Sequence, residues 1–264
     1  MADALSFNMR LLAHHELQGF GGMGEGMGMQ LARDGRRILW LAHESAPKNF
    51  TGVDVSNPRA PRVVVQTELP HANMRSNSLD VVGDTLAVAY QTSQRGLQPA
   101  GFDLFDVSTP EKPALISHFD CSGPHSRGVH VLWFVDGETV HMSSGAPDFQ
   151  PRNPLDDQFY RIVDVRNRSR PAELGRWWLP GTREGDSVPA PARLDPRIAT
   201  GYRVHNTNVF PARPDRAYVG YIDGGAMILT SRTSRALRWL RTGAIRRPST
   251  ASPTRCCRFS AAIC

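Results

Sequence analysis

Arginine, asparagine and histidine side chains recur at similar places in three segments of the chain. The segments are Arg75-Ser76-Asn77-Ser78, Arg127-Gly128-Val129-His130 and Arg203-Val204-His205-Asn206. Imidazole nitrogens are frequent ligands of transition metals, and the guanidinium fork suits anionic groups. If the three segments converge, the candidate metal ligands are His125, His130 and His205. The candidate ligand-binding residues are then Arg75, Arg127, Arg203 and Asn206.

A structural role is the alternative for the same residues. Histidine and asparagine side chains can satisfy buried backbone groups at strand ends, and arginines can pair with aspartates on the surface. No two ligands have the close spacing of an H-E-x-x-H helix, and His14-His15-Glu16 matches only half of it. The cofactor therefore stays unknown, with a transition metal as the candidate.

Two motifs of cofactor and catalytic sites lack the context that they need. The run Gly19-Phe20-Gly21-Gly22-Met23-Gly24 fits G-x-G-x-x-G, but a dinucleotide site needs a helix directly after it. Residues 29–33 are too few for that helix, because residues 37–42 already have a strand pattern. We expect a flexible loop leading into the first repeat. Ser126 lacks the G-x-S-x-G context of a nucleophile elbow, so the catalytic residues stay unknown.

The elements that would position these side chains come from a repeat. Residues 50–61, 102–113 and 160–171 align without gaps, and each segment has Asp followed by Val and then by Pro seven residues after the Asp. The apolar half of each copy predicts a short strand, and the polar half predicts a turn in which the Asp side chain bonds backbone N–H groups. The recurring aspartates, Asp54, Asp106 and Asp164, are therefore predicted to be structural turn residues. Asp156 and Asp157, in the long loop that precedes the third copy, are expected to be solvated.

Further strands surround each copy of this signature. Strand patterns follow it at residues 62–67, 114–119 and 172–178, and precede it at residues 37–42, 85–90 and 139–143, with another at 78–82 and 129–134. About four strands in roughly 50 to 60 residues suit a propeller blade. We predict an all-β, incomplete β-propeller over residues 1–229, made of about three four-stranded units plus the start of a fourth. The innermost strands would line a central channel and bring the candidate residues to one axis.

The end of the chain departs from this pattern. The apolar lead-in Ala226-Met227-Ile228-Leu229 is followed by Thr230 where Asp is expected. A shifted frame over residues 229–237 can encode D-I-A-D-L-A-R-P, which is a fourth copy of the signature in register. We interpret residues 230–264 as an out-of-frame, disordered basic tail. The alternative is that the free wobble base of each codon allows such a match by chance.

This tail also explains the net charge of +6. Residues 231–264 hold eight arginines and no Lys, Asp or Glu, so the rest of the chain has 23 basic and 25 acidic residues. We therefore predict no nucleic-acid partner.

Cysteine content and hydropathy indicate the cellular location that we expect for the protein. Cys121 is the one cysteine before the tail, which gives neither a disulfide framework nor a zinc motif. Residues 1–12 lack a basic region followed by an apolar stretch, and no run of about 18 apolar residues occurs. We expect a cytoplasmic protein with no membrane contact, whose partner is an unidentified protein or small molecule.

The repeat signature resembles that of the LVIVD-repeat proteins, whose units read Leu-Val-Ile-Val-Asp followed by a Ser/Asn-Pro turn. Phe102-Asp103-Leu104-Phe105-Asp106 and Tyr160-Arg161-Ile162-Val163-Asp164 carry the resemblance best. It extends over residues 8–225 through Gly123-Pro124-His125-Ser126, Gly175-Arg176-Trp177-Trp178 and Val204-His205-Asn206-Thr207. The resemblance implies a propeller-like fold and a cytoplasmic location, and little about activity.

Three functional hypotheses follow. The first is a binding or scaffold protein that presents loops such as residues 146–158 to a partner. The second is a metal-dependent enzyme, oxidoreductase-like, with a channel lined by His130 and His205. The third is that the chain as written has no function, being truncated by a frameshift. Bound metal after purification would favour the enzyme, and its absence would favour the scaffold.

Overall fold

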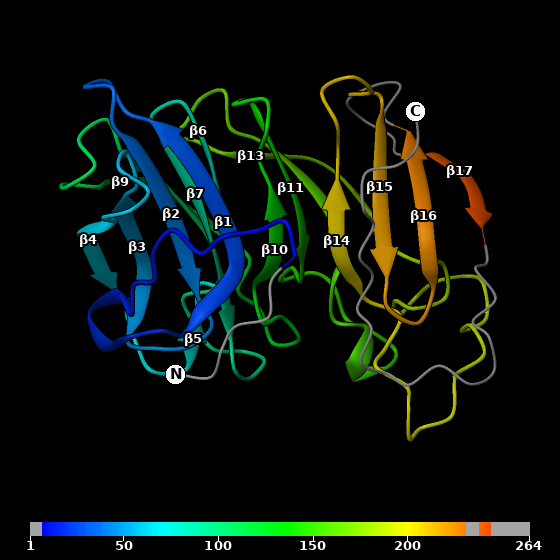
Figure 1. Cartoon of the computed structure of the whole chain (residues 1–264). Coiled ribbons are helices and arrows are strands. Elements are labelled where there is room, and N and C mark those ends of the chain that lie inside the picture. The colour runs from blue at the N-terminus through cyan, green and yellow to red at the C-terminus, as the bar shows by residue number, and fades with distance from the viewer. Residues whose placement is uncertain (1–6, 231–237, 244–264) are drawn as a thin grey trace.

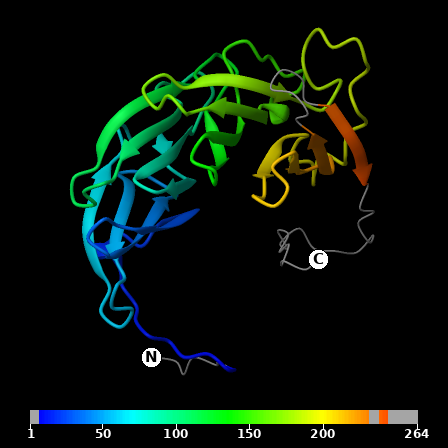
Figure 2. The same cartoon turned by 90° about the horizontal axis from the view of Figure 1, so that it is seen from above.

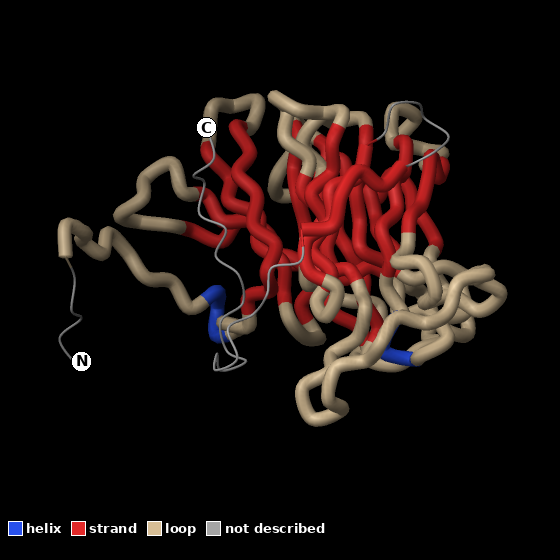
Figure 3. The backbone as a smooth tube through the Cα atoms, turned by 90° about the vertical axis from the view of Figure 1, so that its right-hand side faces the viewer, coloured by secondary structure: helices blue, strands red, loops and turns tan. Residues whose placement is uncertain are grey.

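The structure is a computed structural model that describes residues 7–230 and 238–243 (Figure 1). Its strands form four antiparallel sheets, each built from consecutive strands in their order along the chain. Seen from above, the sheets follow one another around an open arc (Figure 2). Loops gather beyond the strand ends, most of them at one end of the strands (Figure 3). This arrangement confirms the prediction of an all-β, incomplete propeller.

The four sheets have the following strands. The first contains β1 (Met23–Leu31), β2 (Arg37–His43), β3 (Lys48–Asp54) and β4 (Arg62–Glu68). The second contains β5 (Met74–Arg75), β6 (Leu79–Val82), β7 (Thr85–Thr92), β8 (Gly101–Asp106) and β9 (Ala114–Asp120). The third contains β10 (Val129–Trp133), β11 (Thr139–Ser144), β12 (Phe159–Asp164) and β13 (Ala172–Trp177). The fourth contains β14 (Val204–Asn208), β15 (Arg216–Tyr221), β16 (Gly225–Thr230) and β17 (Arg238–Gly243).

The helical content of the described residues consists of two 3₁₀ turns, η1 (Leu17–Gly19) and η2 (Pro154–Asp156). Among these residues no helix has the length and apolar character that crossing a membrane requires.

The signature aspartates terminate the third strand of the first three sheets, as predicted. Asp54, Asp106 and Asp164 each accept a hydrogen bond through Oδ1 from the backbone N–H two residues later, over 2.9, 2.8 and 2.9 Å. At Asp106 the hydrogen bonds from Ser108 lower the pKa of the carboxyl. The charged side chain thus fixes the turn that leads into the fourth strand.

Apolar side chains fill the space between successive sheets. One cluster joins the first and second sheets around Trp40 and Leu86, and another joins the second and third around Phe102 and Phe134. A third cluster joins the third and fourth sheets around Tyr160. Each sheet therefore depends on its neighbour for a core, as expected for repeat architectures.

The innermost strand of the first sheet differs from the expected loop. Part of the glycine-rich run, from Met23 onward, is the start of β1. A Cβ at Gly24, Gly26 or Gly28 would lie 2.7, 2.1 or 2.9 Å from atoms of the second sheet. These glycines are therefore required for close backbone approach between the first two sheets.

The fourth sheet extends past the predicted end of the propeller. β17 pairs with β16 in an antiparallel ladder, although its residues belong to the segment interpreted as an out-of-frame tail. Residues 231–237, which contain most of the shifted-frame signature, and residues 244–264 lie outside the described residues. The frameshift and the boundary at residue 229 remain predictions.

Replacing Gly26 with alanine tests the close packing of β1. The new methyl group meets the backbone nitrogen of Leu79, so we expect a loss of about 1 to 3 kcal/mol in the free energy of unfolding. Urea denaturation measures the loss. Gly21→Ala is the matched control, because nothing lies within 4 Å of a Cβ there. Equal stability of the two variants would contradict the packing.

Candidate metal centre

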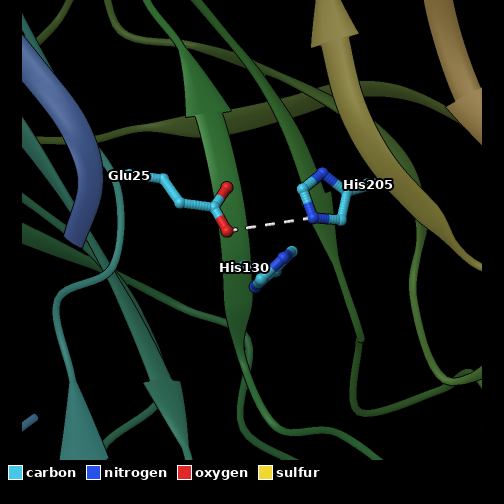
Figure 4. Close-up of side chains that lie close together, drawn as sticks. All are labelled: Glu25, His130 and His205. Carbon is cyan, nitrogen blue, oxygen red and sulfur yellow. Dashed lines mark ion pairs between the residues drawn. The ribbon is translucent and has the colours of Figure 1, made fainter. Parts of the chain in front are cut away.

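Three side chains from three different sheets meet at the inner strands (Figure 4). Glu25 is on β1, His130 on β10 and His205 on β14, and their ligand atoms all lie within 4.8 Å of one another. His205 Nε2 lies 3.9 Å from Glu25 Oε1, and the two imidazole centroids are 4.7 Å apart. Ligand atoms about 2.1 Å from one ion lie roughly 3 to 4 Å from each other. Small side-chain rotations would therefore let all three bind one ion.

β-Bulges direct the two histidines toward this point. The residues on either side of His130 pair with adjacent residues of β11, so His130 is an extra residue in its strand. His205 is the extra residue of β14 in the same way. The ladder between β1 and β2 is also irregular over residues 23–27, which include Glu25. Because a bulge re-aims a side chain, the same local irregularity places all three ligands.

The second sheet has an equivalent irregularity without a titratable ligand. Its inner strand is interrupted between β5 and β6, where Asn77 lies. The backbone carbonyl of Asn77 accepts hydrogen bonds from the N–H groups of Glu25 and Gly26 at 2.9 Å each. The Asn77 amide is fully buried, and neither of its polar atoms has a partner among the described residues. Buried amides without partners are uncommon in folded proteins.

Hydrogen bonds leave the Nε2 atom of each histidine free for an ion. His205 Nδ1 lies 2.7 Å from Asn206 Oδ1, and His130 Nδ1 lies 3.1 Å from Gln91 Oε1. Asn206 Oδ1 is an acceptor and suits a proton on Nδ1 of His205. By contrast, Nδ1 of His130 lies between the Gln91 acceptor and the Arg75 Nη2 donor at 3.4 Å. In the tautomer that is protonated at Nδ1, the Nε2 lone pair is available to an ion, which is the usual arrangement of a metal-binding histidine and its supporting residue.

The surroundings of His130 keep it neutral. Burial lowers the pKa of His130 to about 3, and the nearby His205, Arg75, Arg203 and Arg127 add to the lowering. A metal ligand must be unprotonated. His130 therefore offers its lone pair without competition from protons at neutral pH.

The three predicted arginines lie beside this centre. Arg75 donates to Gln91 Oε1 through Nε at 3.0 Å and Nη2 at 2.6 Å, and its Nη2 lies 3.4 Å from His130 Nδ1. Arg127 Nε pairs with Asp157 Oδ2 at 2.7 Å, and Arg203 Nη1 lies 3.8 Å from Asp157 Oδ1.

The expectation that Asp156 and Asp157 are solvated is wrong. Each is 1% exposed, because the loops fold over them and bring in arginine partners. Arg193 bonds both carboxylate oxygens of Asp156, one of them at 2.8 Å. The long loop thus supplies a buried counter-ion for the arginines at the channel.

The structure brings together some of the predicted site residues and not others. His130 and His205 face each other, Arg75 contacts His130, and Asn206 holds His205. His125 lies before β10 and is not part of the ligand cluster found in the described residues.

Two members of the site, Glu25 and Gln91, were not predicted from the sequence. Glu25 was hidden in a glycine-rich segment expected to be a loop. Gln91 had no signal beyond its place near the end of a predicted strand.

Comparison with known proteins identifies the fold. No protein-family model and no curated protein matches the chain. Among solved structures it is similar to the periplasmic gluconolactonase of Pseudomonas aeruginosa, with 15% identity, a TM-score of 0.54, and coverage of 85% of this chain and 59% of that one. The fold is a β-propeller. The chain thus spans little more than half of that propeller.

The WD40 domain of Pan2 from Neurospora crassa is also similar in structure, with 11% identity and a TM-score of 0.43 over 81% of this chain and 52% of that chain. This second similarity is too low to support any argument.

The low pKa of His130 predicts a pH effect on stability. Its folded pKa of about 3 lies below the unfolded value of 6.5, so the unfolded state takes up a proton first as the pH falls. The metal-free protein should therefore lose about 2 kcal/mol of stability between pH 7 and pH 5 through this residue alone.

Urea denaturation of the wild type and of His130→Gln at both pH values measures this contribution. Between pH 7 and pH 5 the variant should lose about 2 kcal/mol less stability than the wild type. Identical losses in the two proteins would contradict a neutral, buried His130.

Proposed function

We propose that this propeller is a metal-dependent enzyme whose channel binds a divalent transition-metal ion through Glu25, His130 and His205. One observation carries the proposal: ligand atoms from three separate sheets lie within 4.8 Å of one another. Residues so distant in the chain converge only through the fold. The acceptor oxygens of Gln91 and Asn206 beside the two Nδ1 atoms suit the tautomer that a metal needs.

The ligand set favours catalysis over a structural metal. Structural zinc sites use four protein ligands, whereas catalytic sites keep a position for water or substrate. Glu25 is exposed and His205 is partly exposed, so an ion held there would be open to a small molecule. Two histidines and a carboxylate suit zinc or non-haem iron(II).

The ion decides the class of reaction. Iron would support the oxidoreductase chemistry expected from the sequence, and zinc would support hydrolysis by an activated water. The name of the gluconolactonase does not decide between them, because 15% identity supports the fold alone. Membership of the LVIVD-repeat family is part of our proposal, and the Asp-ended strands support it.

A binding or scaffold protein is the second candidate. The surface that favours it is a row of exposed apolar side chains on β1, namely Met23, Met27, Met29 and Leu31. Much of the loop 146–158, the expected binding loop, is packed instead. Ala146 and Phe149 are buried against Phe159 and Trp178, which leaves that loop less surface for a partner.

Metal titration tests the proposed function. The purified, metal-stripped protein should bind one Zn²⁺ or Co²⁺ per chain in isothermal titration calorimetry. His130→Ala and His205→Ala should each weaken the affinity about 100-fold or more, because each removes a ligand. His118→Ala is the matched control, because its imidazole pairs with Asp103 at 2.6 Å away from the cluster. Wild-type binding no tighter than that of the two variants would overturn the proposal.

The role of Asn206 can be tested separately. Asn206→Ala removes the acceptor that holds Nδ1 of His205, so metal affinity should fall about tenfold. Because Asn206 is exposed, the variant should keep the stability of the wild type. A spectrum of the Co²⁺ protein reports the change in geometry. Unchanged affinity and spectrum would show that Asn206 does not support the ligand.

A further inference from the structure

The arginines beside the candidate metal centre outnumber their buried carboxylate partner. Asp157 faces three guanidinium groups, with Arg127 Nε at 2.7 Å, Arg95 Nη2 at 3.4 Å and Arg203 Nη1 at 3.8 Å. One carboxylate neutralises one of the three charges. A partly buried site with this excess of positive charge attracts anions.

Arg203 is the least satisfied of these groups. Its contact with Asp157 is the longest of the three, and its buried Nε has no hydrogen-bond partner among the residues that the structure describes. Burial lowers the pKa of Arg203, and the neighbouring Arg127 and Arg95 act in the same direction. A nearby oxyanion would offset this charge repulsion.

A cavity lies beside two of these arginines and next to the residue that supports His130. Its volume is about 300 Å³, and its lining includes Arg75, Arg127 and Gln91. Glu44 also lines it and pairs with Arg75, so an anion in the cavity would compete with Glu44 for this guanidinium group. Gln91 is also the hydrogen-bond partner of His130. A small molecule in this cavity would therefore lie one residue away from the candidate metal ligands.

The positions of the arginines in the fold support one shared site. Arg75 is in β5, Arg127 lies two residues before the inner strand β10, and Arg203 directly precedes the inner strand β14. They therefore enter the channel from the same end of successive sheets. Surface pairing with the turn aspartates Asp54, Asp106 and Asp164 would have been the alternative, but none of the three arginines pairs with them among the described residues.

We propose that Arg75, Arg127 and Arg203 bind the carboxylate or phosphate group of a small-molecule ligand beside the metal ion. Arg75 and Arg127 contact the anion from the cavity wall, and Arg203 supplies further positive charge. The anionic group would anchor the molecule while another of its atoms reaches the ion. The position beside a metal rests on the proposed function, whereas anion binding by the arginines does not require the metal.

Anion titration of the metal-free and the Zn²⁺-loaded protein tests the inference, with inorganic phosphate and succinate as probes. We expect at least one of the two anions to bind the metal-free wild type, and to bind more tightly at low salt. Binding of phosphate alone or of succinate alone supports the inference and identifies the group that the site prefers. Failure of both anions to bind either form of the protein overturns it.

Two variants locate the site. Arg203→Gln and Arg75→Gln should each weaken anion binding at least tenfold, and circular dichroism shows whether each variant is folded. If Arg75→Gln is unfolded, Arg203→Gln alone decides. Arg213→Gln is the matched control, because that arginine pairs with Asp215 at 3.2 Å on the surface and should bind anions like the wild type.

The two proposals fail in different ways. Anion binding that is unaffected by Arg203→Gln and Arg75→Gln overturns the arginine site, whatever the metal does. Arginine-dependent anion binding in a protein that binds no metal supports the arginine site and removes the metal-dependent function. Metal binding without any anion binding supports the metal-dependent function and overturns the arginine site.

Discussion

The Asp side chain that ends the third strand of a sheet is the interaction on which the rest of the structure depends. By accepting the N–H group two residues later, Asp54, Asp106 and Asp164 fix where one strand stops and the next begins. A slip of one residue would move every side chain of a strand to the opposite face. Both faces of the second and third sheets contribute to apolar clusters, so such a slip would disrupt two cores. The Asp turns therefore determine how neighbouring sheets pack against each other, and this packing determines how the sheets follow one another around the arc.

The arc in turn determines what the inner strands can do. Each inner strand has an irregularity at a similar height, and three of the four irregular segments carry a carboxylate or an imidazole. Regular strands would direct alternate residues to the two faces of the sheet, where neighbouring sheets cover them. The bulges turn Glu25, His130 and His205 out of this alternation. The site is thus made by local departures from the strand geometry that the rest of the repeat enforces.

The sequence predicts the fold far better than the site. The strands β2 to β4 and β6 to β13 lie close to the ranges predicted from the apolar segments and the Asp turn, because both signals are local. His130 and His205 were found through their equal places in the repeat. Glu25 was missed because glycine and methionine give no strand pattern, and its strand forms only where glycines allow close contact with the second sheet.

Two errors have the same cause, which is that burial in a loop depends on distant residues. Asp157 was expected to be solvated, but the loop that carries it folds toward arginines 30 or more residues away on either side along the chain. His125 lies close to His130 in sequence, yet proximity in sequence does not place it in the channel. The repeat determines where the side chains of strand residues lie, whereas it does not determine the positions of side chains on long loops.

The ligand cluster also lies where the fold is least supported. Apolar clusters join the first sheet to the second, the second to the third and the third to the fourth, but no such cluster in residues 7–230 joins the first to the fourth. The contact between Glu25 and His205 connects those two sheets directly. An ion bound there would tie the ends of the arc together, and at about 1,000 times its dissociation constant it would add about 4 kcal/mol to the stability of the folded state. In an open propeller the same ion could therefore serve both as the reactive centre and as the link that fixes the channel around it.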